Sequence, residues 1–334
     1  MPNRRHLLTG LGLLALPTAR TGRAQPAPAS AWPTRPITLL VGFAPGGGTD
    51  IISRLLQPAL QQALGQPIAV DNRPGASGTI AALAGTRAAP DGYTLFMTTV
   101  SASAVVPPVM VPPPFDIHRD QTPVVLAATV PLVAVVPLAS PARDLRGFIE
   151  HARAHPGVLN YSSSGVATQQ HLAAELLAAR AGIQMTHVPF RGTGQAVNEI
   201  LAGRIDLAID TFPTYLPHIR ADRVRVLAVT TPARIPWLPE VPTVAESGFP
   251  GFDPAGFDAN VWYMLMGPPG LPTPIAERLA VAVNAALADP VLGPRVRDAG
   301  FIPGGGTSAD AAALLARDAA RYAALIRAAN IRLE

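Results

Sequence analysis

A glycine-rich segment, Gly42 to Asp50 (GFAPGGGTD), lies between a short apolar run and a stretch with helical periodicity. Such a loop leaves several backbone N–H groups free to point at one anion, and the dipole of the following helix adds to the attraction. The segment lacks the lysine of a phosphate-binding P-loop and the spacing of a dinucleotide fingerprint. It therefore favours a carboxylate or phosphate over a nucleotide. The alternative is a tight turn in which Thr49 or Asp50 caps the helix.

A second loop, Tyr161 to Thr168 (YSSSGVAT), also leads from a predicted strand into a predicted helix. Its serine and threonine hydroxyl groups add donors to those of the backbone. If the two loops belong to different lobes, they can grip one acidic ligand from both sides. Taken alone, however, a serine cluster is equally typical of caps and turns.

Asp210 follows the apolar run Ile205 to Ile209, at the point where a predicted strand ends. Its carboxylate could accept hydrogen bonds from an ammonium, amide or hydroxyl group of a ligand. It could equally cap the turn before Pro213. The sequence leaves both interpretations open.

The same residues do not form the motifs of a hydrolase or a zinc enzyme. No G-x-S-x-G sequence surrounds Ser162 to Ser164. His171 and Glu175 lie four residues apart on one helix face, but neither an H-E-x-x-H motif nor further spaced ligands accompany them. We interpret His171 as structural, and we expect no catalytic residue, metal or cofactor. An exported enzyme acting on a small carboxylate is the alternative function, and a scaffold or adhesin without a small ligand is a third.

Strand-like and helix-like segments alternate along the chain, which predicts an α/β fold with mostly parallel sheets flanked by helices. In such sheets ligands bind at the carboxyl ends of the strands, where both loops lie. We expect Val124 to Ala139, which Pro131 and Pro137 interrupt, to form two buried strands. Thr307 or Ser308 is placed to cap the last helix. The predicted strands are 37–41, 68–70, 93–98, 159–162, 185–188, 205–209, 224–229 and 261–266, and the predicted helices are 51–64, 80–87, 169–181, 195–202, 275–288 and 309–329.

The amino terminus has the order of an export signal. Asn3 to His6 is basic, Leu7 to Leu16 is apolar, and residues 22–24 form a small-x-small cleavage site. About ten apolar residues are too few for a membrane anchor, which needs ~20. The pair Arg4-Arg5 resembles a twin-arginine signal, although ordinary secretory signals also carry two arginines. We expect residues 1–24 to be a signal peptide and the mature chain to be periplasmic.

The composition argues against nucleic acid and membrane partners. Residues 1–24 contain four of the 26 basic residues and no acidic one, so the mature chain has 22 of each and is formally neutral. The chain has no cysteine, which excludes disulfides, thiolate metal sites and a lipoprotein anchor. We expect a soluble monomer without membrane insertion.

Together the segments resemble the tripartite tricarboxylate transporter solute receptors, also called the Bug receptor family. The resemblance covers about residues 35–330 and implies a two-lobed clamp of the type II periplasmic-binding-protein kind. After a linker at 25–36, residues 32–130 and 249–334 would form lobe I and residues 131–248 lobe II. A small organic acid would be the ligand, and a membrane permease or sensor the partner. The matching segments, in order, are VGFAPGGGTDIISRLL, VDNRPGASGTIAA, PDGYTLF, LNYSSSGVATQQHLAAELL, HVPFRGTGQAV and VRVLAVTTPARIPWLPEVPTVAESG.

The resemblance also implies that a ligand carboxylate is held between the lobes, partly through ordered water. Two departures bear on the ligand: Ala167-Thr168 stands where the family usually has Gly-Ser, and Phe190-Arg191 where Tyr-Lys is common. The extra methyl groups narrow the pocket and the lost phenol removes a polar contact, so a relative's ligand does not transfer. The implied contacts are Phe43, Gly46, Gly47, Thr49, Ala76, Gly78, Thr98 and Ser101 from lobe I, and Ser163, Ser164, Gly165, Thr168, Phe190, Arg191 and Asp210 from lobe II.

Overall fold

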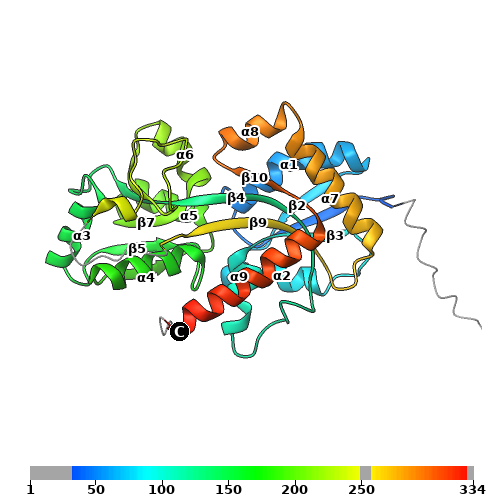
Figure 1. The fold of residues 1–334 in the computed structure, drawn as a ribbon, viewed down its shortest axis with the longest axis horizontal. Coiled ribbons are helices and arrows are strands. Elements are labelled where there is room, and N and C mark those ends of the chain that lie inside the picture. The colour runs from blue at the N-terminus through cyan, green and yellow to red at the C-terminus, as the bar shows by residue number, and fades with distance from the viewer. Residues whose placement is uncertain (1–31, 249–256, 329–334) are drawn as a thin grey trace, which may run out of the picture. The chain divides into compact units, whose positions relative to one another are not determined.

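The computed structural model describes residues 32–248 and 257–328 of the 334-residue chain (Figure 1). The predicted signal peptide and most of the predicted linker lie outside the described residues. The chain divides into two units, Met1–Trp32 and Pro33–Glu334, and the second carries all the labelled elements. In the described part of the chain, no helix combines the length and the apolar character needed to cross a membrane.

One half of the second unit is built on three parallel strands in the order β2-β1-β3. These are β1 (Ile37–Val41), β2 (Ile68–Asn72) and β3 (Thr94–Thr99), joined by α1 (Gly48–Leu64) and α2 (Thr79–Thr86). Helix α1 buries apolar residues four positions apart, which directs its apolar stripe against the core. We call this half lobe I.

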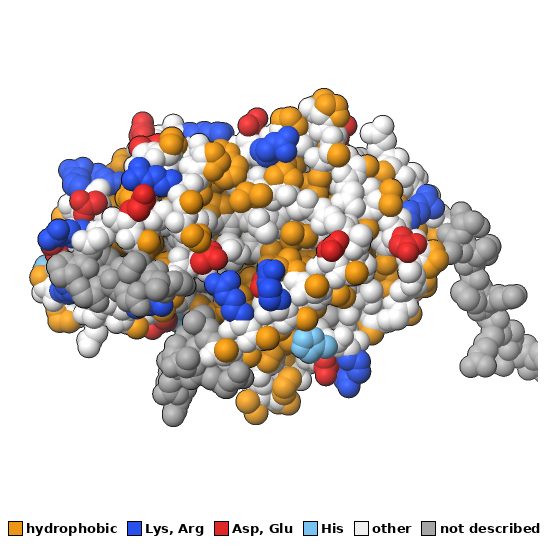
Figure 2. Space-filling view, in the orientation of Figure 1, with side chains coloured by type: hydrophobic (Ala, Val, Ile, Leu, Met, Phe, Trp, Pro, Cys, Tyr) orange, Lys and Arg blue, Asp and Glu red, His pale blue; other side chains and the backbone are white. Residues whose placement is uncertain are grey.

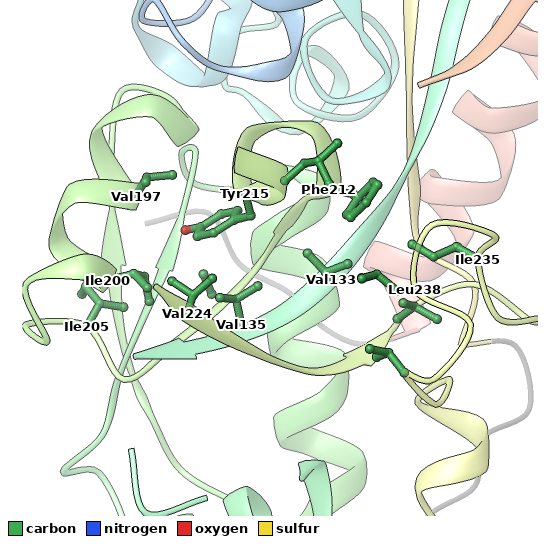
Figure 3. Packing of buried hydrophobic residues seen from close by; sticks show 14 residues of the cluster. Val133, Val135, Val197, Ile200, Ile205, Phe212, Tyr215, Val224, Ile235 and Leu238 are labelled. Atoms are coloured by element: carbon green, nitrogen blue, oxygen red, sulfur yellow. The ribbon is translucent and has the colours of Figure 1, made fainter. Parts of the chain in front are cut away.

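The other half, which we call lobe II, repeats the same arrangement. Its parallel strands are β5 (Asn160–Ser163), β6 (Thr186–Pro189) and β7 (Leu207–Thr211). Its helices are α3 (Leu145–Ala154), α4 (Gln169–Ala181), α5 (Thr193–Leu201) and α6 (Phe212–Arg220), and strand β8 (Val224–Val229) follows. Figure 3 shows the apolar core of this lobe, in which Val133 and Val135 of the sheet pack with Phe212 and Tyr215 of α6.

Strand β4 (Thr122–Pro137) runs through both halves, and the expectation of two separate strands here is wrong. Up to Pro131 it pairs with β9 (Asn260–Gly267), and from Leu132 onward it pairs with β7 and β8. Pro131 lies where β4 changes partners, so its missing N–H coincides with the end of one hydrogen-bond ladder. The proline therefore marks a change of partner inside one continuous strand.

The chain returns from lobe II to lobe I through β9, which is antiparallel to both β3 and β4. The remaining elements complete lobe I: α7 (Thr273–Ala288), α8 (Leu292–Asp298), β10 (Ile302–Gly305) and α9 (Ser308–Ala328). Thr307 caps α9 as predicted, because the Asp310 N–H donates to its hydroxyl over 3.2 Å and the Asp310 carboxylate accepts from the Thr307 N–H over 2.8 Å. The sequence prediction missed α3, α6, α8 and β10; α6 contains Pro213 and Pro217, and α8 and β10 are short.

The two-lobed α/β prediction is confirmed, with parallel pairing within β1–β3 of lobe I and within β5–β7 of lobe II. Strands β4, β8, β9 and β10 pair antiparallel, which makes each sheet mixed. The lobe boundaries at residues 130, 131, 248 and 249 stay a prediction. Figure 2 shows basic and acidic side chains interspersed over the face in view, without a field of one sign.

The two connections between the lobes meet at Thr230, a fully buried residue just after β8. Its hydroxyl donates to the Ala259 carbonyl oxygen over 2.6 Å and accepts from the Leu132 N–H over 3.2 Å. Valine has nearly the same shape as threonine, but it would leave the Ala259 carbonyl oxygen and the Leu132 N–H without the Thr230 hydroxyl as a hydrogen-bond partner. We expect Thr230→Val to lower the free energy of unfolding by about 1–3 kcal/mol, measured by urea denaturation.

The matched control is Thr231→Val, which removes a hydroxyl that donates to the Ala233 carbonyl oxygen at a more exposed position. We expect this change to cost less than about 0.5 kcal/mol. Equal losses in the two variants would show that Thr230 does not tie the crossing segments together.

Candidate functional site

A narrow pocket of about 20 Å³ lies where the loops that follow β1, β3, β5, β6 and β7 meet. Both of the predicted anion-binding loops reach it, the first through the start of α1 and the second through Ser164. The two lobes therefore share one pocket. Its lining residues are Phe43, Gly47, Gly48, Thr49, Thr99, Ser101, Val261 and Tyr263 from lobe I, and Ser164, Gln170, Thr193 and Thr211 from lobe II.

Four helices begin at this pocket: α1 from lobe I, and α4, α5 and α6 from lobe II. Residues of each first turn, or of the position just before it, line the pocket. In none of the four does the side chain of the N-cap residue accept a hydrogen bond from the helix. The Gln169 N–H of α4 donates to Ser101 Oγ over 3.1 Å, and Pro213 contributes no N–H to the first turn of α6. The positive ends of the four helix dipoles still point toward the pocket and would favour an anion there. This pocket has no cationic side chain in its lining, so the donors that it offers are neutral.

Tyr263 of β9 closes one side of the pocket against the start of α1. A Cβ atom at Gly48 would lie 2.1 Å from the Tyr263 hydroxyl oxygen, so the close approach requires glycine at this position. Burial, and then the nearby Asp210 carboxylate, raise the pKa of Tyr263 far above its ordinary value. The phenol therefore keeps its proton and can act as a hydrogen-bond donor.

Asp210, at the end of β7, lies behind the lining and is fully buried. Its Oδ1 accepts hydrogen bonds from Gln170 Nε2 over 3.1 Å, Thr193 Oγ1 over 2.9 Å and the Thr211 N–H over 2.6 Å. All three donors belong to residues that line the pocket. Burial raises the pKa of Asp210 to about 6, while the same three donors act in the opposite direction.

A second cavity adjoins the first, and Phe43 and Ser164 line both. The lobes touch around it: the Ala44 N–H donates to the Arg191 carbonyl oxygen over 3.1 Å, and the Ser77 hydroxyl donates to the Val166 carbonyl oxygen over 2.6 Å. These contacts describe a closed arrangement of the two lobes. Besides Phe43 and Ser164, the residues that line this second cavity are Gly75, Ala76, Ser77, Gly78, Gly165, Val166, Pro189, Phe190 and Arg191.

The structure brings ten of the fifteen predicted site residues to these cavities. Phe43, Gly47, Thr49, Ser101 and Ser164 line the first, and Ala76, Gly78, Gly165, Phe190 and Arg191 line the second. Ligand contact by these residues stays a prediction. The five that line neither cavity are Gly46, Thr98, Ser163, Thr168 and Asp210.

Hydrogen bonds within the protein account for the side chains that lie off the lining. The Thr98 hydroxyl is 2.8 Å from that of Ser103, and the Thr168 hydroxyl donates to the Gly165 carbonyl oxygen over 2.7 Å. The Gly46 N–H donates to Asp50 Oδ2 over 3.0 Å. This hydrogen bond joins the loop to the first turn of α1.

Sequence reasoning missed seven of the residues that line the first pocket. Most are isolated threonines or lie inside an apolar strand, so no local motif distinguishes them. Thr193, which immediately follows the segment HVPFRG, is the one whose place at a strand-to-helix loop could have drawn attention. The seven are Gly48, Thr99, Gln170, Thr193, Thr211, Val261 and Tyr263.

Three stacked rings support the loop that carries Ser164. The ring centroids of His171 and His187 are 4.0 Å apart, and those of His187 and Tyr161 are 4.9 Å apart, with nearly parallel planes. His171 Nδ1 accepts from the Ala167 N–H over 3.0 Å, which gives His171 a structural task. In addition, Ser163 Oγ lies 2.7 Å from His187 Nε2. Among the described residues, no group of three or more His, Cys, Asp or Glu side chains is placed to hold a metal ion.

Comparison with known proteins gives concordant findings. The model of the tripartite tricarboxylate transporter family receptor matches residues 52–331. A UPF0065 protein from the tcbD-tcbE intergenic region of Pseudomonas sp. (strain P51) is 40% identical over 97% of this chain and 94% of its own. The structure of R. palustris Rpa4515 with adipate is 34% identical, with a TM-score of 0.85 over 90% of this chain and 99% of that one. MatC from Rhodopseudomonas palustris with bound malate is 31% identical, with a TM-score of 0.81 over 87% and 98%.

The buried histidine His171 makes stability depend on pH. Burial lowers its pKa from the ordinary 6.5 to about 4, so the unfolded chain binds a proton near pH 6.5 that the folded chain does not accept until about pH 4. The free energy of unfolding should therefore fall as the pH drops from 7 to 4, with a contribution from His171 of about 2–3 kcal/mol.

We expect His171→Asn, whose amide oxygen can still accept from the Ala167 N–H, to reduce this pH dependence. Urea denaturation at pH 7, 5.5 and 4.5 measures it. The control variant is His155→Asn, at an exposed position outside the stacked rings of Tyr161, His187 and His171. The same pH dependence in His171→Asn as in the wild type would exclude this role.

Proposed function

This chain belongs to the tripartite tricarboxylate transporter receptor family, and on that premise we propose that it is a periplasmic solute-binding protein that closes its lobes around a small organic carboxylate. The observation that carries this proposal is the meeting of four helix starts, from both lobes, at one pocket, none of them with a side-chain bond from its own N-cap residue. A carboxylate oxygen can accept several such N–H donors at once.

The ligand class follows from the donors. The lining offers hydroxyl, amide and backbone N–H groups, and a single carboxylate matches their number and spread better than a neutral solute would. The solved relatives that carry adipate and malate support a carboxylate. Ala167-Thr168 and Phe190-Arg191 distinguish this chain from the usual family pattern, so we do not assign either acid to it.

The mechanism is binding by closure. Each lobe supplies only part of the donor set, so the ligand gains its full set of hydrogen bonds only when the lobes meet. A ligand shifts an equilibrium by its differential affinity for the two states, and here that difference favours the closed state. The few direct contacts between the lobes, such as Ser77 with Val166, fix the geometry of closure.

We propose no catalytic role. Ser163 and His187 lie at the distance of a nucleophile and its base, but Ser163 is fully buried and lines neither cavity. Its hydroxyl also donates to the Gly165 carbonyl oxygen over 2.9 Å. The pair therefore supports the loop conformation and does not face a substrate.

The proposed partner is a membrane permease or sensor that recognises the closed form. We propose export by residues 1–24 through the twin-arginine route, and these residues lie outside the described ones. We also propose that residues 32–130 with 249–334 and residues 131–248 move as the two bodies of the clamp.

Substitutions at Gly47 test the pocket. Its backbone φ is −80°, and a Cβ atom there would meet nothing closer than the Ala44 carbonyl oxygen at 3.6 Å, so alanine fits. The longer side chain of leucine enters the pocket. We expect malate, adipate or another small mono- or dicarboxylate to raise the melting temperature of the wild type by roughly 4–8 °C at 100-fold excess over Kd.

In the same assay Gly47→Ala should keep most of this shift and Gly47→Leu should lose it, while both unliganded variants melt near the wild-type temperature. A full shift in Gly47→Leu would place the ligand elsewhere. If no carboxylate in the panel stabilises the wild type and none co-purifies by native mass spectrometry, the proposed function fails.

A further inference from the structure

Asp210 has one oxygen with three donors and another with none. No protein group within the described residues is hydrogen-bonded to Oδ2, although it is fully buried. Removing a carboxylate from water without full pairing is costly, and the neutral acid relieves that cost. The two oxygens are therefore suited to different tasks, Oδ1 as an acceptor and Oδ2 as a site for a proton.

No basic side chain compensates the charge of Asp210. The groups around it are Gln170 of α4, Thr193 of α5, Thr211 at the start of α6, and two tyrosines, Tyr215 of α6 and Tyr263 of β9. Burial and the Asp210 charge raise the pKa of both tyrosines, so both are neutral at physiological pH. In the described part of the chain, no arginine or histidine forms a hydrogen bond or ion pair with Asp210.

An anion in the pocket would face Asp210 through a single layer of side chains. The three Oδ1 donors come from Gln170, Thr193 and Thr211, and each of these residues also lines the pocket. A ligand carboxylate would thus bring a second negative charge to the far side of the same groups. Like charges at this separation disfavour each other's ionised form, and a low-dielectric surrounding strengthens the effect.

We propose that Asp210 is a positioning residue that takes up a proton when an anionic ligand enters the pocket, so that ligand binding is coupled to proton uptake. The inference rests on the proposed function and concerns its regulation. Oδ1 keeps its three donors in either protonation state and so keeps the lining in place. The neutral Asp210 removes the repulsion, so the bound state favours the protonated form.

The direction of the pH effect follows from linkage. Burial raises the pKa of Asp210 to about 6 in the unliganded protein, and a bound anion raises it further. Between pH 8.5 and 6.5 the complex therefore binds more protons than the free protein, and affinity rises as pH falls. We expect Kd for malate or adipate, whichever binds, to fall about tenfold over this range, in which the ligand carboxyl groups are ionised.

Calorimetry in two cationic buffers of different ionisation enthalpy, such as Bis-Tris and Tris, measures the protons taken up at pH 7 without adding an anion that could compete for the pocket. We expect about half a proton or more per ligand for the wild type. Asp210→Asn keeps an acceptor oxygen for the three donors and imitates the protonated acid, so it should take up none. Its Kd should be constant between pH 8.5 and 6.5, near the value of the wild type at the lower pH.

Asp206→Asn is the matched control, because Asp206 belongs to the same lobe but lines neither cavity and accepts from the Asn160 N–H. It should keep the wild-type proton uptake. Wild-type binding without proton uptake, or uptake that persists in Asp210→Asn, would overturn the inference and leave the proposed function standing. Wild-type protein that binds no carboxylate would instead remove the proposed function. If Asp210→Asn does not fold, Asp210→Ser replaces it in the same comparison, and absence of uptake in the wild type overturns the inference without either variant.

Discussion

The helix starts of α1, α4, α5 and α6 are the constraint on which the site depends. A helix cannot pair its first N–H groups internally, and in these four the N-cap residue supplies no side-chain acceptor. Both lobes direct them at one pocket, where an anion can satisfy several at once. The start of α1 can approach Tyr263 only because residue 48 is glycine. A Cβ atom at Gly48 would collide with the Tyr263 hydroxyl group.

A second constraint concerns the strands that cross between the lobes, because they connect the two halves of the site. Strand β4 is continuous through both sheets and is buried along nearly all of its length. Its change of partner at Pro131 and Leu132 and the hydrogen bonds of Thr230 lie together, so the connections are packed where they meet.

The ionisable groups near the pocket do not line it but form hydrogen bonds with the residues and loops that do. Asp210 orders three donors without lining the cavity, and His171 and His187 hold the Ser164 loop in their neutral forms. Burial disfavours charge on all three, which lowers the pKa values of both histidines to about 4 and raises that of Asp210. A pocket lined by neutral donors can thus still respond to pH through its supporting residues.

Local patterns in the sequence were sufficient for most of the strand-loop-helix units and for both loops that reach the pocket. An apolar run, a glycine cluster and a helical period lie within about twenty residues, so each unit can be recognised without its neighbours. The partners of β4, the approach of Tyr263 to Gly48 and the place of Asp210 behind the lining join segments that are distant in the chain. These three features could be seen only in the tertiary structure. Strand pairing and burial depend on which distant surfaces meet, and such contacts produce no periodic pattern in the sequence.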